Sequence, residues 1–170
     1  MQITIIKGAS DDRIDACRAD GTKVSTRFPK KGPVPHDAVH YFVESELRIA
    51  NGFWGMVAAG HDPEEIASLA KAAGHASAKR ARVPDPTIVA IVQAERAVEC
   101  FEADLWGGGG ADNQSLRDLL AAGCAQSLVP PIAVSDAAIM RIRGALADLR
   151  DRWSRMKAGE SMTLNWEVVV

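Results

Sequence analysis

The 170-residue chain has few aromatic residues, few cysteines and no long apolar run. Its nine aromatic side chains offer little for stacking on nucleic-acid bases, and a formal charge of -2 gives no general attraction to a polyanion. The longest basic cluster, Lys79-Arg80-Ala81-Arg82, contains no aromatic residue. The composition therefore predicts a protein that binds no nucleic acid.

No segment approaches the roughly 18 apolar residues that cross a membrane, and residues 1–7 lack the features of a signal peptide. We therefore expect no membrane partner and a cytoplasmic location. The three cysteines, Cys17, Cys100 and Cys124, are widely separated and have no C-x-x-C spacing. Neither a disulfide framework nor a cysteine-rich zinc site is predicted.

Alternating apolar and polar residues predict strands at both ends of the chain. The alternation covers residues 2–5 and 23–28, with a weaker candidate at 14–18 and an Asp20-Gly21 turn between the last two. Residues 162–168 alternate in the same way. A strand needs partners, so we expect the two chain ends to meet in one small, mainly antiparallel sheet.

The middle of the chain is expected to form about five helices. They run from Pro35 to Asn51, from Asp62 to Gly74, from Asp85 to about Trp106, around Leu116–Leu120, and from Ser135 onward. An apolar turn is expected at residues 53–59. With 47% hydrophobic and 25% charged residues, the chain is predicted to fold as one α+β domain spanning residues 1–170.

The last predicted helix carries a regular apolar seam. Its members are spaced alternately three and four residues apart: Ile139, Ile142, Leu146, Leu149, Trp153 and Met156. Such spacing is typical of a helix that packs against another helix. The partner is either a helix of the same chain, which we favour, or a second copy in a homodimer.

Two histidines, His36 and His40, lie one turn apart at the start of the first predicted helix. A rotation of about 100° per residue places both on the stripe that carries Val43 and Leu47, so they face inward. At positions i and i+4, both imidazoles can reach one divalent ion such as zinc. The helix dipole also favours the neutral, metal-binding form of His36.

A third ligand is expected from the long helix. Glu95, Glu99 and Glu102 continue its apolar stripe. Carboxylates in such a position are usually paired with a base, a hydrogen-bond donor or a metal. We therefore assign His36, His40 and at least one of these three glutamates as candidate metal ligands.

Asp37 and Glu44 are the candidates for positioning a water molecule in a metal-assisted hydrolysis. Glu44 lies about 12 Å along the helix axis from His36, too far for both to hold one ion. Three other interpretations stay open. The histidines are hydrogen-bonded core residues, or they perform acid-base chemistry with the glutamates without a metal. Alternatively, the protein is non-catalytic and binds a partner through the seam or the Phe53-Trp54 segment.

The run P-H-D-A-V-H-Y-F-V-E at residues 35–44, followed by G-F-W-G-M-V-A-A-G at residues 52–60, resembles a family of uncharacterised bacterial proteins. Members of that family look to share a P-H-D-x-x-H-[FY]-x-V-E helix and a G-x-[FW]-G-x-x-A-A-G segment. The resemblance implies no particular reaction. It draws attention to the helix that carries His36 and His40.

Separately, His36-Asp37-x-x-His40 is similar to the H-E-x-x-H helix of zinc metallopeptidases, with Asp37 where their general-base glutamate stands. The similarity implies a zinc ion held by the two histidines. It departs from the motif at Asp37, because aspartate is one methylene shorter and must still reach a water molecule. Residues and resemblance together predict a metal-binding protein, with metal-dependent hydrolysis as the candidate activity.

Overall fold

The computed structural model describes residues 1–30, 32–72 and 83–167. The predicted helix end at Gly74, the basic cluster at residues 79–82 and Val168 lie outside them. The elements are β1 (Gln2–Ile6), β2 (Asp11–Cys17), β3 (Lys23–Pro29), α1 (His36–Leu47), α2 (Phe53–Ala58), α3 (Pro63–Ala72), the 3-10 turn η2 (Pro86–Ile88), α4 (Val89–Trp106), α5 (Asn113–Gln126), α6 (Asp136–Arg155) and β4 (Ser161–Asn165). The fold is α+β, as predicted.

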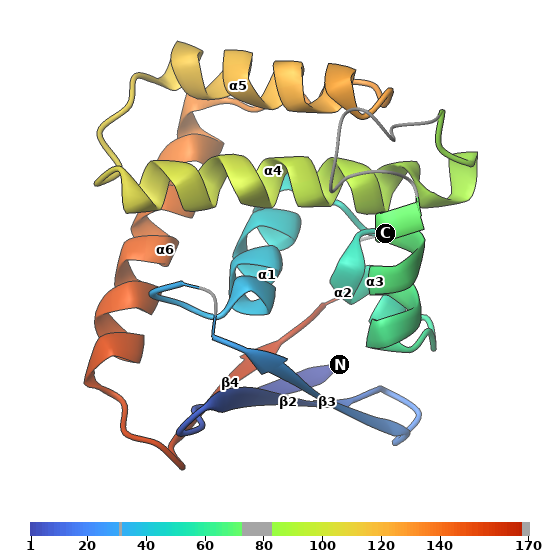
Figure 1. Cartoon of the computed structure of the whole chain (residues 1–170), viewed down its shortest axis with the longest axis vertical. Helices are drawn as coiled ribbons and strands as arrows, with labels where there is room; N and C mark the ends of the chain where they lie inside the picture. The colour runs from blue at the N-terminus through green and yellow to red at the C-terminus, as the bar shows by residue number, and fades with distance from the viewer. Residues whose placement is uncertain (31, 73–82, 168–170) are drawn as a thin grey trace.

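The four strands form one antiparallel sheet in the order β3-β2-β1-β4 (Figure 1). The chain ends meet in this sheet, because β1 pairs with β4 and the Met1 ammonium donates to the Trp166 carbonyl oxygen at 2.9 Å. The side chains of Ile3, Ile5 and Met162 are buried under the helices. The prediction of a shared sheet with one apolar face is therefore confirmed.

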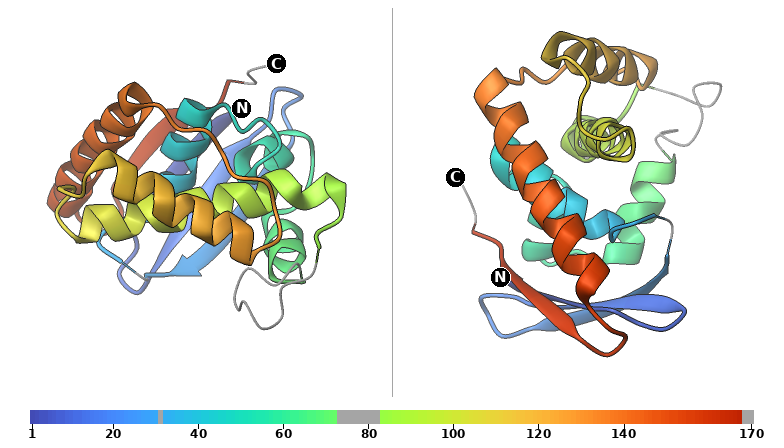
Figure 2. Two further views of the ribbon diagram at one scale, coloured as in Figure 1. Left: turned by 90° about the horizontal axis from the view of Figure 1, so that it is seen from above. Right: turned by 90° about the vertical axis from the view of Figure 1, so that its left-hand side faces the viewer.

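In the described part of the chain, all helices lie on one face of the sheet (Figure 2). Helices α1, α2 and α3 lie next to the sheet, α4 crosses above them, α5 covers α4, and α6 runs along one side. Because α4 contacts α1, α5 and α6, it is the central helix. None of the described helices has the length and apolar character needed to cross a membrane.

The apolar seam of α6 is buried within the monomer. Ile139, Ile142, Leu146, Leu149 and Trp153 are all buried, and α6 packs against α1 and α4. The seam therefore has its partner within the same chain, as favoured from the sequence. These side chains are not available for the alternative, a homodimer through this helix.

Helix α1 ends at Leu47, four residues before the predicted end at Asn51. Arg48 adopts the left-handed conformation with φ 54°, and the N–H of Ile49 returns to the carbonyl oxygen of Glu44 at 2.9 Å. This turn satisfies the end of the helix and reverses the chain. The following segment consequently lies beside Glu44.

Residues 53–58 form the short helix α2 and not the predicted turn. The Glu44 carboxylate accepts hydrogen bonds from the N–H groups of Phe53 and Trp54 at 3.0 and 3.1 Å. These are two of the N–H groups at a helix start that have no partner within the helix. Because a side chain from another helix satisfies these N–H groups, the local sequence of residues 53–58 did not indicate a helix.

Candidate metal centre

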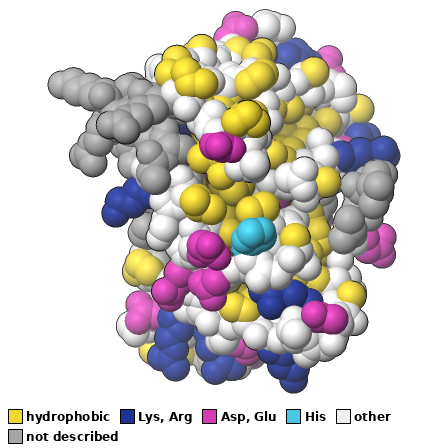
Figure 3. Space-filling view, turned by 90° about the vertical axis from the view of Figure 1, so that its right-hand side faces the viewer, with side chains coloured by type: hydrophobic (Ala, Val, Ile, Leu, Met, Phe, Trp, Pro, Cys, Tyr) yellow, Lys and Arg dark blue, Asp and Glu magenta, His cyan; other side chains and the backbone are white. Residues whose placement is uncertain are grey.

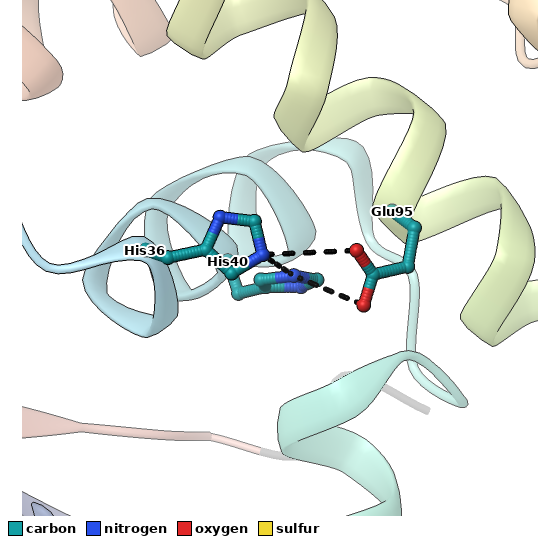
Figure 4. Close-up of side chains that lie close together, drawn as sticks. All are labelled: His36, His40 and Glu95. Atoms are coloured by element: carbon teal, nitrogen blue, oxygen red, sulfur yellow. Dashed lines mark hydrogen bonds and ion pairs between the residues drawn. The ribbon is translucent and has the colours of Figure 1, made fainter. Parts of the chain in front are cut away.

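His36 and His40 project from α1 toward Glu95 on α4 (Figure 4). The Nε2 atoms of the two histidines are 3.2 Å apart. The Glu95 carboxylate lies beside both, with Oε2 3.7 Å from Nε2 of His36 and Oε1 3.6 Å from Nε2 of His40. Within the described residues, these three form the one group whose donor atoms, all within 4.8 Å of one another, could hold a metal ion.

The other ring nitrogen of each histidine contacts a carboxylate of its own. Nδ1 of His36 lies 3.0 Å from Oε1 of Glu102, and Nδ1 of His40 lies 2.7 Å from Oε1 of Glu44. An ionised carboxylate only accepts hydrogen bonds, so we assign the proton of each neutral ring to Nδ1. Each neutral ring then has its lone pair on Nε2.

The two Nε2 lone pairs consequently face one another, and they repel unless a positive charge lies between or beside them. That charge is either a proton on a ring or a metal ion. Two nitrogens bound to one zinc ion at about 2.0–2.1 Å in tetrahedral geometry lie about 3.3–3.4 Å apart. The observed 3.2 Å is close to this separation. The donor set therefore fits a divalent ion with little movement of either ring.

The surrounding carboxylates set the charge of the histidines when no metal is bound. Burial alone would lower the pKa of His36, but the hydrogen bond with Glu102 and the nearby Glu95 carboxylate outweigh it and raise the pKa to about 9. Burial is likewise outweighed at His40, where the Glu95 charge and the Glu44 hydrogen bond raise the pKa well above 6.5. A metal ion at this site would therefore have to displace protons from the same nitrogens.

The centre is closed on one side and open on the other. The His40 side chain is 1% exposed, whereas that of His36 is 37% exposed. His36 and Glu102 line a cavity of about 640 Å³, whose other walls come from β2, β3, the segment before α1, α2, α3 and the rest of α4. A ligand can therefore reach the centre past His36.

Glu44 is not placed to position a water molecule, which corrects the role expected for it. Its side chain has no exposed surface, and its oxygens are engaged by His40 and by two N–H groups of α2. A Cβ atom at Gly52 would lie 2.6 Å from the carboxylate carbon, so a larger residue there would displace the carboxylate. Glu44 orients His40 instead. The i, i+4 spacing of the two residues carried this signal in the sequence.

The three glutamates of α4 take three different positions. Glu95 faces both histidines, and Glu102 contacts only Nδ1 of His36. Glu99 is exposed, with Oε2 2.8 Å from Nη1 of Arg96. The expected meeting of α1 histidines with α4 carboxylates therefore holds for Glu95 and Glu102 but not for Glu99.

Fold and site together describe an α+β protein in which two histidines and one glutamate converge between two helices. No protein-family model matches the chain, and no curated protein or solved structure is significantly similar to it. Its function is therefore inferred from the chemistry of this centre and of the cavity beside it.

Proposed function

We propose that the protein binds a divalent metal ion, with zinc the first candidate, through Nε2 of His36, Nε2 of His40 and the carboxylate of Glu95. One observation carries the proposal: both Nε2 atoms converge on Glu95 while each Nδ1 is occupied by a separate carboxylate. Histidines that bind metals commonly donate their other N–H to a carboxylate, which orients the ring and raises its basicity. Two histidines and one carboxylate leave a coordination position for a substrate.

Hydrolysis is the reaction that this donor set supports best. A divalent ion in such a site acts as a Lewis acid and makes water easier to deprotonate. Asp37 is the candidate proton acceptor, because it is half-buried and lines the cavity next to His36. Burial raises the pKa of its carboxyl, which strengthens it as a base. Its backbone carbonyl accepts a hydrogen bond from Nε1 of Trp54 at 2.8 Å, which anchors this turn of α1.

The non-catalytic alternative relied on two surfaces, and both are largely buried. The α6 seam is buried, and so are Phe53 and Trp54. The other alternative, direct pairing of the histidines with glutamates, uses the same contacts as metal binding. The presence or absence of a bound ion distinguishes direct pairing from metal binding.

Elemental analysis of untagged protein, purified without chelator, tests metal binding. We expect about one divalent ion per chain and its loss in Glu95→Gln, because a structural or catalytic zinc site needs at least three protein ligands. Glu99→Gln is the matched control, since Glu99 lies one turn further along α4 and outside the group. Equal metal content in the two variants would disprove the assignment. So would metal-free wild-type protein after dialysis against a zinc salt.

The histidines provide a second matched pair. His36→Ala should lose the metal, and we choose it because His36 is partly exposed and its removal should leave the protein folded. His61→Ala should keep the metal, because His61 lies outside the group and contacts Glu65 at 3.9 Å. Retention of the ion in both variants would count against the proposed ligands.

Ester hydrolysis by the zinc-loaded protein, followed with p-nitrophenyl acetate, tests the activity separately. Asp37→Asn should lower the rate by about 10²–10⁴-fold, the usual contribution of a general base, and leave the metal content unchanged. An unchanged rate would remove Asp37 from the reaction. An unchanged rate after metal removal would show that the hydrolysis does not arise at this centre.

A further inference from the structure

The cavity beside the proposed metal centre has features that metal binding does not use. Its volume of about 640 Å³ lies within the range of about 300–1,000 Å³ that is typical of small-molecule sites. It is also the side from which His36 is exposed. The chemistry of its walls therefore indicates what class of molecule reaches the centre.

Aromatic side chains form part of these walls. Phe28, Phe53 and Trp106 all line the cavity. Trp106, the last residue of α4, is 58% exposed, which is high for a residue type that is usually well buried. Its ring lies against Gly32, where a Cβ atom would come within 3.2 Å of Cζ2. The indole is thus held on one side and leaves apolar surface for a ligand.

Carboxylates predominate among the charged groups of the lining: Asp12, Asp37, Glu64, Glu99 and Glu102. Figure 3 shows the neighbouring side of the molecule, on which acidic side chains gather in one group while most basic side chains lie apart, towards the sheet. Helix α3 lies on this side, and its first turn carries Glu64 and Glu65. The entrance is therefore acidic.

Two permanent cations, Lys30 and Arg27, line the cavity among the described residues, and Lys30 is already engaged. Nζ of Lys30 donates to the carbonyl oxygens of Gly8 and Ala9 at 2.7 and 3.3 Å and lies 3.8 Å from Asp12. Arg27 lies at an exposed position of β3 and also lines the cavity. A bound divalent ion would not reverse the balance, because Glu44, Glu95 and Glu102 surround it. With five carboxylates against Lys30, Arg27 and His36, the lining is acidic on balance and disfavours an anionic ligand.

We infer that this cavity binds a small organic cation, an amine on a short apolar or aromatic stem. The ammonium group lies among the wall carboxylates, and the stem lies against Trp106, where the ring also attracts the cation. The inference that such an amine is the substrate rests on the proposed function, because it needs the metal. The binding of the amine in the cavity does not. The wall carboxylates and the aromatic surface of the cavity are present with or without the ion.

Three probes of similar shape and different charge test the inference: benzylamine, benzyl alcohol and benzoate. Each is titrated into the full chain, metal-free and zinc-loaded, and followed by ligand-observed NMR. Benzylamine should bind about tenfold more tightly than benzoate in both forms, as expected for one charge near several carboxylates at a protein surface. Equal binding of the three probes, or a preference for benzoate in either form, would overturn the inference.

Matched variants locate the binding. Trp106→Ala and Glu64→Gln should each weaken benzylamine binding about threefold or more, the scale of an exposed cation–π contact or one screened charge. The controls are Leu119→Ala, an exposed apolar residue on α5, and Glu65→Gln, which does not line the cavity. Benzylamine binding that is unaffected by both cavity variants would place the amine elsewhere.

Metal content is measured on the same samples, which separates the two proposals. Amine selectivity without metal would contradict the proposed function and support the cavity inference. Metal binding with a preference for benzoate would support the proposed function and contradict the cavity inference.

Discussion

Helix α4 carries two buried groups of charged side chains, and they differ in how completely their members satisfy one another. Near its C-terminal end, the two oxygens of Asp104 accept hydrogen bonds from Arg143 at 2.7 and 2.9 Å. The Arg143 guanidinium also donates to Asn113 and to the Ala111 carbonyl oxygen at 2.8 and 2.7 Å. In the first half of the helix, Glu95 lies 3.6–3.7 Å from two imidazole nitrogens that face each other.

This difference in satisfaction indicates that the Asp104–Arg143 group is structural and that the Glu95 group is suited to binding a ligand. A buried ion pair whose donors are engaged fixes the geometry of a loop and has no position for a further atom. A largely buried carboxylate that faces two nitrogens from beyond hydrogen-bond distance costs stability unless something else satisfies it. We therefore expect the Asp104–Arg143 pair to govern folding and the Glu95 group to govern binding.

The largest effect is expected from breaking the Asp104–Arg143 pair. Arg143→Ala should lower the free energy of unfolding by about 3–5 kcal/mol, because it leaves a buried carboxylate without its partner. Arg141→Ala, which removes an exposed arginine paired with Glu46, should cost at most about 1 kcal/mol. Urea denaturation measures both. Comparable losses would show that the buried pair is no more structural than a surface one.

The next effect is the stabilisation by metal. At a free zinc concentration of about 100 times Kd, the wild-type protein should gain about 2.7 kcal/mol over the metal-free form, because the ion binds only the folded chain. Thermal denaturation with and without chelator measures this gain. Glu95→Gln should abolish it. Arg143→Ala should retain it, and loss of the gain in that variant would mean that the two groups are not independent.

The metal-free protein should lose stability as the pH rises from about 6.5 to 9. His36 has a folded-state pKa of about 9, above its ordinary value of 6.5. Its contribution is therefore complete below pH 6.5 and disappears as the pH passes through 9, a loss of about 2 kcal/mol after allowance for its partly exposed ring. Zinc affinity should change in the opposite sense, rising as the protons leave. His36→Gln should reduce the pH dependence of the metal-free protein's stability, and His61→Gln should leave it unchanged.

The smallest effect is expected from the carboxylate behind His36. Glu102→Gln should lower zinc affinity about tenfold, at the lower end for a residue that orients a ligand, and should leave the fold intact. Competition with a chelator of known affinity measures the change. A loss as complete as that of Glu95→Gln would instead make Glu102 a ligand.

Several features of the site could be predicted from the sequence because they depend on one helix alone. The i, i+4 spacing of His36 and His40 fixes their separation in any straight helix, and the apolar residues around them fix the face they occupy. The apolar spacing of α6 predicted its buried side in the same way. Alternation at both chain ends likewise predicted the shared sheet, since a strand with one apolar face needs neighbours.

What only the tertiary structure decided is which of these faces meet, and at what level along the helices. Glu95 and Glu99 are one turn apart on the same stripe of α4, yet only Glu95 lies opposite the histidines. That choice depends on the crossing of α1 and α4, which local periodicity does not specify. The contacts of Glu44 with α2 were hidden for the same reason, because the N–H groups of Phe53 and Trp54 reach its carboxylate only after the chain turns at Arg48. Spacing within an element is local chemistry, whereas contact between elements is set by packing of the whole core.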